Sequence, residues 1–183
     1  MKRILAALML SALIAAPAFA ALKQGAAAPD FTADGALGGQ PFTFHLADAL
    51  NRGPVVVYFF PAAFTSGCTQ ETKMFADAAD EFAANGATLI GVTRGATDRL
   101  AEFSTEVCRN KFPVAAVSEQ TVKAYKVSTM LTPGWSDRTS YVIAPDGTLF
   151  PLDQITEQQS KGRFSFHADL DQSGTWKAIL APK

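Results

Sequence analysis

An unbroken run of β-branched and aromatic residues, Val55-Val56-Val57-Tyr58-Phe59-Phe60, lies in the first half of this 183-residue chain. A run with no polar alternation is typical of a strand that is buried on both faces. Such a strand needs other elements packed above and below it, so the run indicates an α/β arrangement. Pro61 ends the run, because proline has no backbone N–H to donate to a sheet.

The rest of the chain alternates between strand and helix patterns. The expected elements, in chain order, are a half-buried strand at 42–46, the buried strand at 55–60, a helix over 69–84 closed by Asn85-Gly86, a strand over 88–92, a helix around 100–107, a strand over 112–117, a short helix at 122–127, and two strands, 138–143 and 148–152, around the turn Pro145-Asp146-Gly147. This order predicts an α/β fold with a central mixed β-sheet flanked by helices.

The first 20 residues have the pattern of a targeting segment. Lys2 and Arg3 precede an apolar run, and Ala18-Phe19-Ala20 ends the segment. This pattern predicts a secretory signal peptide over residues 1–20 that is cut after Ala20, and therefore a secreted or periplasmic protein. The alternative is an uncleaved membrane anchor, but the run is shorter than the about 20 apolar residues that a membrane span requires.

After the signal, we expect one domain over residues 21–152. Residues 153–183 have weaker periodicity and are expected to be a divergent extension, a hairpin or a helix, packed on the same domain. Phe164 and Phe166 alternate with polar residues, which favours an edge strand or an apolar patch that faces a partner.

Composition excludes several classes of function. With 16 basic and 17 acidic residues the net charge is −1, so the chain shows no electrostatic footprint for nucleic acid. Its two cysteines cannot form a small disulfide scaffold or a four-ligand zinc site, and His45 and His167 are too few and too far apart for a metal site. The cysteines remain either a structural bridge or a reactive pair.

Cys68 has the position of a nucleophile. It falls in the first turn of the helix that follows the most buried strand, at the carboxyl end of the sheet, where open α/β sheets bind ligands. Unpaired N–H groups and the positive end of the helix dipole favour a thiolate there. Thr65 offers a hydroxyl that can bridge a thiolate and a bound oxygen, and Pro61 places an apolar ring near the mouth of the pocket.

The pattern Pro61-x-x-x-Thr65-x-x-Cys68 after a buried strand resembles the peroxidatic motif of peroxiredoxins. The flanking residues Tyr58-Phe59-Phe60 and Gly67-Cys68-Thr69-Gln70-Glu71 look most like the peroxiredoxin Q (bacterioferritin comigratory protein) branch, and the resemblance extends from about Gly25 to about Leu152. It implies a thioredoxin-like fold and a thiol peroxidase that reduces hydrogen peroxide and organic hydroperoxides. It also implies that the enzyme uses no metal, haem or flavin.

The resemblance also implies roles for individual residues. Cys68 would be the peroxidatic cysteine, Thr65 would orient the peroxide and Pro61 would shield the sulfenic acid. Arg138, at the start of the strand Arg138-Thr139-Ser140-Tyr141, corresponds to the arginine that holds the thiolate and polarises the peroxide in this family. Glu71 could pair with this arginine, or could be a solvated acid in the first helical turn.

Cys108 is the only candidate for a resolving cysteine. Many members of the branch place a second cysteine five residues after the first, where this chain has Lys73. By resemblance, Cys108 would form an intramolecular disulfide with Cys68 after local unwinding, and a thioredoxin-like or other dithiol would reduce it. The alternative is that Cys108 is a buried small hydrophobe and that Cys68 acts alone. Trp135, near Arg138, is expected either to wall the pocket or simply to pack.

Two other functions remain open from the residues alone. A thioredoxin-like thiol–disulfide oxidoreductase would share the fold, but it uses Cys-x-x-Cys, and Thr65 and Glu71 occupy the positions three residues before and after Cys68. A non-enzymatic exported domain would instead keep a permanent Cys68–Cys108 disulfide. For partners, we expect a hydroperoxide and a dithiol reductant, no nucleic acid, no stable membrane association after signal cleavage, and a monomer or weak homodimer.

Overall fold

The computed structural model describes residues 22–23, 25–130, 132–151, 164–170 and 176–182. The predicted signal peptide and its cleavage position therefore lie outside the described residues, as does the segment 152–163. The elements are β1 (Thr32–Leu37), β2 (Gln40–His45), α1 (Leu46–Leu50), β3 (Val55–Phe59), α2 (Ser66–Ala84), β4 (Thr88–Thr93), a 3₁₀ turn (Thr97–Arg99), α3 (Leu100–Glu106), β5 (Val114–Ala116), α4 (Glu119–Ala124), β6 (Thr139–Ile143), β7 (Leu149–Pro151), β8 (Phe164–Leu170) and β9 (Trp176–Pro182).

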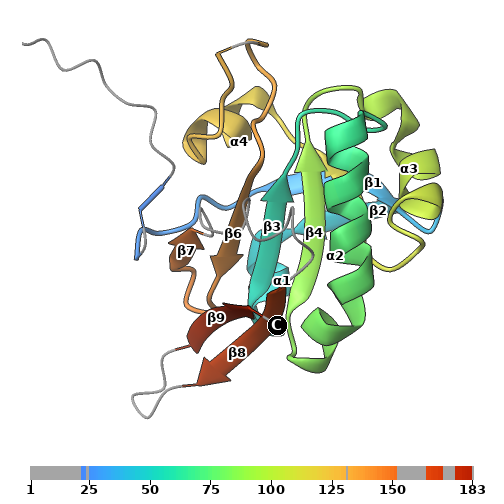
Figure 1. Ribbon diagram of the computed structural model, residues 1–183. Helices are drawn as coiled ribbons and strands as arrows, with labels where there is room; N and C mark the ends of the chain where they lie inside the picture. Colours follow the sequence, from blue (N-terminus) through green and yellow to red (C-terminus); the bar gives the residue numbers. More distant parts are fainter. Residues whose placement is uncertain (1–21, 24, 131, 152–163, 171–175, 183) are drawn as a thin grey trace, which may run out of the picture.

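A seven-stranded mixed sheet with the order β2-β1-β5-β4-β3-β6-β7 forms the centre of the fold. β3, β4 and β5 are parallel, whereas β6 runs antiparallel to β3. The carboxyl ends of the three parallel strands therefore meet at the same edge of the sheet, and the chain enters β6 at that edge. Figure 1 shows that α2 begins at this edge and runs back along the sheet.

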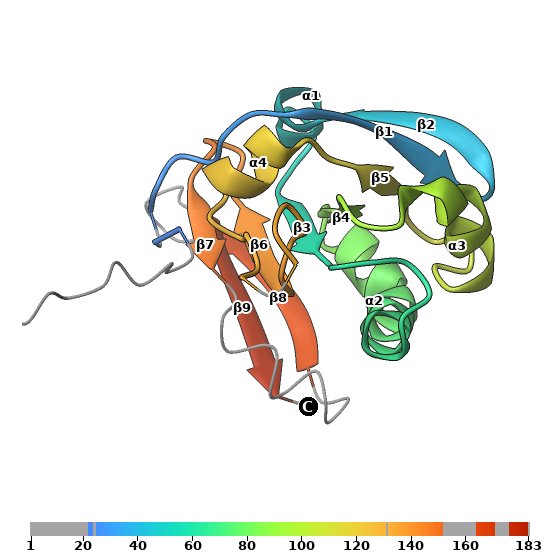
Figure 2. The same ribbon diagram turned by 90° about the horizontal axis from the view of Figure 1, so that it is seen from above.

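The central strand β3 is buried on both faces, as its sequence predicted. Val56 and Tyr58 belong to a cluster with α2 and α3, whereas Val55, Val57 and Phe59 belong to a second cluster with α1 and α4. The helices thus form two layers around the sheet (Figure 2). This arrangement confirms the expected α/β fold with a mixed sheet flanked by helices.

The room for Tyr58 comes from a glycine in the neighbouring strand. A Cβ atom built on Gly91 of β4 would lie 2.5 Å from the Tyr58 ring. Any larger residue at position 91 would therefore displace this ring, which stacks between Phe60 and Phe75. The close approach of α2 to the sheet depends on this space.

Most expected elements are confirmed, with some differences at their ends. α2 begins at Ser66, not at Thr69, because Thr65 with φ −73° and ψ 149° forms the N-cap before any apolar spacing starts.

β1 and α1 were not expected. β1 has the sequence TADGAL, which is poor in strand-forming residues, and its pairing with both β2 and β5 holds it in the sheet. In the described part of the C-terminal extension, β8 and β9 form an antiparallel hairpin, which is one of the two expected forms.

No helix among the described residues combines the length and the apolar content that a membrane crossing requires.

Candidate active site

Cys68 is the third residue of α2, and Thr65 is the N-cap of this helix. The Cys68 side chain is only 3% exposed, while Thr65 is exposed at the surface of the same turn. The first turn of α2 contains no acidic residue, so no carboxylate within it offsets the positive end of the helix dipole. Cys68 therefore lies among the N–H groups of the first turn that have no partner within the helix.

The loop that carries Pro61 and Thr65 is held from several sides. The Thr93 hydroxyl donates to the Pro61 carbonyl at 3.1 Å, and the buried Ser136 hydroxyl donates to the Phe60 carbonyl at 2.8 Å. The Thr65 hydroxyl donates to the Ala62 carbonyl at 3.2 Å, so it turns towards its own loop. These hydrogen bonds fix the path of the chain into α2 before any substrate arrives.

Phe64 anchors this loop to α3. Its backbone has a φ of 62°, which is uncommon for an aromatic residue. The Phe64 ring packs edge-on against the Phe103 ring, with centroids 5.1 Å apart. The Arg99 guanidinium lies 4.0 Å from the centroid of the Phe64 ring and forms a cation–π contact with it. The unusual backbone conformation of Phe64 is therefore stabilised by contacts on its ring.

Arg138 reaches the first turn of α2 from the strand β6. Thr139, the next residue, pairs with Phe59 of β3, which brings Arg138 to the edge of the sheet where α2 begins. A Cβ atom built on Gly67 would lie 3.1 Å from Nη1 of Arg138, so the guanidinium rests against the backbone directly before Cys68. Residues 67 and 138 are far apart in the sequence, and the sheet brings them together.

Glu71 lies one helical turn after Gly67 and is buried, with 7% of its surface exposed. Of the two alternatives for Glu71, the solvated acid is therefore wrong. The Oε2 atom of Glu71 is buried and has no hydrogen-bond partner among the described residues. Burial raises the pKa of Glu71 to about 7, and the positive charge of Arg138 offsets part of this effect. The carboxyl and the guanidinium thus interact electrostatically beside Cys68.

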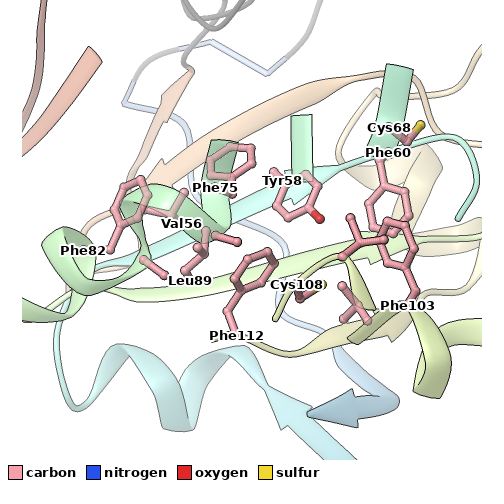
Figure 3. Close-up of a cluster of buried hydrophobic side chains, with 14 of the residues drawn as sticks. Val56, Tyr58, Phe60, Cys68, Phe75, Phe82, Leu89, Phe103, Cys108 and Phe112 are labelled. Carbon is pink, nitrogen blue, oxygen red and sulfur yellow. The ribbon is translucent and has the colours of Figure 1, made fainter. Parts of the chain in front are cut away.

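Cys108 lies two residues beyond α3 and is completely buried. Both cysteines are free thiols and belong to the same apolar cluster. Figure 3 shows Cys68 at the edge of this cluster beside Phe60, and Cys108 beside Phe112. Burial raises the pKa of Cys108 far above its usual value, so this thiol stays protonated and unreactive in this conformation.

The segment after Cys108 is attached to α2 by surface ion pairs. Arg109 donates to the Asp77 carboxylate and to the Lys73 carbonyl, and Lys111 pairs with Asp80 at 2.7 Å. Arg109 and Asn110 have φ values of 52° and 60°, two consecutive left-handed residues that are not glycine. The sequence does not reveal this attachment, because the spacing of charges along one helix does not identify their partners on another element.

Trp135 lies beside Pro61. A Cβ atom built on Gly95 would lie 2.7 Å from the Trp135 ring and 2.3 Å from the Pro61 carbonyl oxygen, so the indole rests on a backbone that touches the Pro61 loop. The ring is half-buried. Of the two expectations for Trp135, the contact with Gly95 shows packing, and a wall of the pocket stays a prediction.

His45 is the N-cap of α1 and pairs with Asp30 at 2.9 Å and with Asp48 at 3.1 Å. Across the described residues, no group of three or more histidine, cysteine or acidic side chains is arranged to hold a metal ion. The side chain of His167 lies outside the described part of the chain.

Known proteins with similar sequences and structures identify the family. A model of the AhpC/TSA family matches residues 24–150. A Mycobacterium tuberculosis protein named "Putative peroxiredoxin" is 36% identical over 138 residues, which cover 73% of this chain and 84% of that protein. The chloroplastic peroxiredoxin Q of Oryza sativa subsp. japonica is 30% identical over 131 residues, 70% of this chain and 57% of that protein.

Among solved structures, the peroxidoxin BcpB of Mycobacterium tuberculosis superposes with a TM-score of 0.61 at 28% identity, covering 77% of this chain and 96% of that one. Its fold is the thioredoxin-like fold that the motif around Cys68 implied. The chain therefore belongs to the AhpC/TSA family, the peroxiredoxins, and is a thiol-dependent peroxidase.

Proposed function

We propose that Cys68 is the cysteine that reacts with the peroxide. Its thiolate attacks the terminal oxygen of a hydroperoxide, an S–O bond forms and the O–O bond breaks. The sulfur is oxidised to a sulfenic acid, and the leaving oxygen takes up a proton and departs as water or an alcohol. The observation that carries this proposal is the position of Cys68 in the first turn of α2, with the Arg138 guanidinium against Gly67.

The surrounding residues supply charge and shape. The Arg138 guanidinium, which is always charged and has several donors, stabilises the thiolate and the negative charge that develops on the leaving oxygen. Thr65 lies on the exposed side of the same turn, where its hydroxyl can turn from the Ala62 carbonyl to the bound peroxide. Pro61 limits the access of water to the Cys68 sulfur, and the charge of the Glu71 carboxyl positions the Arg138 guanidinium.

Cys108 resolves the sulfenic acid. Its thiol displaces hydroxide from the Cys68 sulfur, an S–S bond forms and water is released. Because both thiols are buried among aromatic rings, the first turn of α2 and the end of α3 unwind before the bond forms. An external dithiol then reduces the disulfide by thiol–disulfide exchange and restores both cysteines.

Rapid kinetics with the reduced chain test this proposal. Stopped-flow mixing with stoichiometric hydrogen peroxide is followed by titration of the remaining thiols in the wild type, Cys68→Ser and Cys108→Ser. We expect fast thiol loss in the wild type, none above the rate of free cysteine in Cys68→Ser, and a dimedone-reactive sulfenic acid in Cys108→Ser. Slow loss in the wild type would contradict the peroxidase role of Cys68.

A second measurement separates resolution by Cys108 from action by Cys68 alone. After one turnover, mass spectrometry of the wild type is expected to show a mass loss of two hydrogens and a peptide that joins Cys68 to Cys108. If Cys108→Ser turns over with a dithiol as fast as the wild type, Cys108 has no catalytic role. A wild type that is purified with a permanent Cys68–Cys108 disulfide, formed without peroxide, would support the non-enzymatic alternative.

We also propose that the chain is exported and loses residues 1–20. The support is the basic start, the short apolar run and the small residues at positions 18 and 20. Expression of the full chain in a bacterium with two membranes, followed by N-terminal sequencing of the periplasmic fraction, is expected to give Ala21 as the first residue. Recovery of the chain in the cytoplasm with Met1 intact would contradict export.

A further inference from the structure

A pair of buried hydroxyl groups joins the helix of the reactive cysteine to the central strand of the sheet. Tyr58 of β3 and Thr72 of α2 share a hydrogen bond of 2.9 Å, and both side chains are completely buried. We propose that Tyr58 is a positioning residue for Cys68, because its hydroxyl holds the second turn of α2 on the sheet through Thr72. This inference rests on the proposed reaction of Cys68 and on its resolution by Cys108.

Thr72 lies one helical turn after Cys68. The two residues are four positions apart in α2 and both are buried, so they lie on the same face of the helix. In an α-helix the N–H of residue 72 donates to the carbonyl of residue 68. A side chain that is held at Thr72 therefore fixes the part of the backbone to which the turn of Cys68 is attached.

The Tyr58 ring is held from several sides. It stacks on Phe60 and on Phe75, with centroids 5.3 Å and 4.4 Å apart. A Cβ atom built on Gly91 would lie 2.6 Å from the Tyr58 hydroxyl oxygen, so the oxygen also rests against the neighbouring strand β4. Because the ring has no room to turn away, the hydrogen bond fixes the position of Thr72 relative to the sheet.

The surroundings make this hydrogen bond costly to break. Apart from Tyr58 and the two cysteines, the described buried members of this cluster have hydrocarbon side chains. Figure 3 shows the Tyr58 hydroxyl on the side of the ring that faces Phe60 and Cys108. Burial raises the pKa of Tyr58 well above its usual value, and a negative charge on Cys108 would raise it further, so the hydroxyl stays protonated. If the bond between Tyr58 and Thr72 breaks, each oxygen is left buried without water.

The hydrogen bond acts on the two chemical steps in opposite directions. The reaction with peroxide needs the first turn of α2 in its wound form, in which the Arg138 guanidinium lies against Gly67. Formation of the disulfide needs the same turn unwound, because Cys108 is buried away from the surface. A hydrogen bond that holds Thr72 on the sheet favours the wound form. Its loss should therefore slow the first step and accelerate the second.

Tyr58→Phe removes the hydroxyl and keeps the ring. Formation of the sulfenic acid is measured by stopped flow with hydrogen peroxide in a Cys108→Ser background, and formation of the disulfide by rapid quenching with an alkylating reagent in the chain with both cysteines. We expect the first rate constant to fall by about threefold and the second to rise by roughly threefold, in keeping with the modest net contribution of one hydrogen bond. Thr72→Val, which keeps the shape of threonine, should change both rate constants in the same way.

The double variant separates positioning from stability. Each single substitution leaves one hydroxyl buried without a partner and should lower the melting temperature. Tyr58→Phe combined with Thr72→Val replaces both groups by apolar groups of the same shape and should restore most of that loss. The two rate changes should persist in the double variant and be no larger than in either single variant, because all these variants lack the same hydrogen bond. A double variant with wild-type rate constants would overturn the inference.

Two further variants serve as controls. Tyr125 belongs to the cluster on the other face of the sheet and donates its hydroxyl to the Pro29 carbonyl at 2.7 Å. Tyr125→Phe should therefore lower the melting temperature and leave both rate constants within about twofold of the wild type. Thr72→Ser keeps the hydroxyl and should retain the wild-type rate constants.

The possible failures of this test are distinguishable. Rate changes of the same size in Tyr125→Phe, or changes of both steps in one direction in Tyr58→Phe, would show a merely structural role and would overturn the inference. A wild type that forms neither a sulfenic acid nor a disulfide would instead overturn the proposed reaction of Cys68 itself.

Discussion

Glu71 is a buried carboxyl beside a guanidinium, and its ionisation has a cost in stability. Burial raises its pKa from 4.5 to about 7 in the folded chain. In the unfolded chain this carboxyl ionises near pH 4.5. Between pH 4.5 and pH 7 the folded chain therefore binds the proton more tightly than the unfolded chain does. The contribution to stability is therefore complete below pH 4.5 and is lost as the pH rises through 7, at a cost of about 3 kcal/mol.

Glu71→Gln is accordingly expected to raise the free energy of unfolding by about 2 kcal/mol at pH 8 and to change it little at pH 4.5, because glutamine has no charge to bury. Urea unfolding at the two pH values measures this difference. Glu106→Gln, at an exposed position on α3, should show no such dependence on pH. A glutamine variant less stable than the wild type at pH 8 would mean that the pair with Arg138 outweighs the cost of burial.

Gly67 gives Arg138 the space to lie on the first turn of α2. In Gly67→Ala the new methyl group lies 3.1 Å from Nη1, so the guanidinium has to move by a few tenths of an ångström. We expect the reaction of Cys68 with peroxide to slow by about tenfold, since small displacements of a positioned charge are costly in rate. Thermal unfolding should change little, because alanine favours a helix. Ser66→Ala is the matched control, and equal rates in both variants would contradict this role for Arg138.

The segment 108–111 and the helix α2 together determine how easily Cys108 is released. Two left-handed residues, Arg109 and Asn110, each cost about 1 kcal/mol or more, and the exposed pairs with Asp77 and Asp80 oppose their relaxation. Removal of both pairs should therefore favour the unwound conformation in which Cys108 meets Cys68.

Asp77→Asn combined with Asp80→Asn is expected to speed formation of the disulfide by roughly threefold, because exposed pairs contribute only modestly. Stopped-flow fluorescence after one equivalent of peroxide measures this step apart from the first oxidation of Cys68, which should not change. Salt at 0.5 M should act on the wild type in the same direction, since it screens both pairs. Asp34→Asn on β1 serves as the control, and an unchanged rate in the double variant would show that these pairs do not limit release.

The start of α1 carries a cluster whose strength depends on pH. Hydrogen bonds to Asp48 and Asp30 raise the pKa of His45 above 6.5. The stabilisation is complete below pH 6.5 and is lost as the pH rises through the raised pKa, because the histidine must be protonated to form ion pairs. The difference in melting temperature between the wild type and His45→Gln should thus be larger at pH 5.5 than at pH 8.5. Differential scanning calorimetry checks this, and a constant difference would contradict the cluster's role.

Local patterns predicted the elements with strong periodicity, and contacts between distant residues decided the rest. β3 could be predicted directly, because a strand that is buried on both faces has an unbroken apolar run. α2 could be predicted as well, because a helix that is buried on one side has apolar residues at helical spacing. β1 escaped prediction because it is held in the sheet by β2 and β5 and not by its own residues. The motif predicted Cys68, Thr65 and Pro61, whereas the burial of Glu71 and the position of Trp135 against Gly95 depend on the packing of three elements.

The whole molecule separates its reactive edge from its C-terminal hairpin. Figure 1 shows the N-terminal end of α2 at one end of the sheet and the β8–β9 hairpin at the other. The register of the hairpin places apolar residues opposite one another on one face, Phe164 with Pro182, Phe166 with Leu180, Ala168 with Ala178 and Leu170 with Trp176. A two-stranded hairpin is marginal alone, so we expect this face to be covered by the domain.

Truncation of the chain after Pro151 tests this separation. Loss of the hairpin should lower the melting temperature and promote self-association, because it uncovers apolar surface on the remaining domain, while Cys68 should react with hydrogen peroxide within about twofold of the wild-type rate. Calorimetry, light scattering and stopped-flow kinetics measure the three effects. Two neighbouring substitutions test the same point without a deletion. Phe166→Asp places a charge on the apolar face of the hairpin and should have the same effects as the truncation. His167→Asp places the charge on the opposite face and should have none of these effects. Equal effects of these two substitutions would show that the hairpin does not bury one face against the domain, and a large loss of peroxide reactivity on truncation would tie the hairpin to the site.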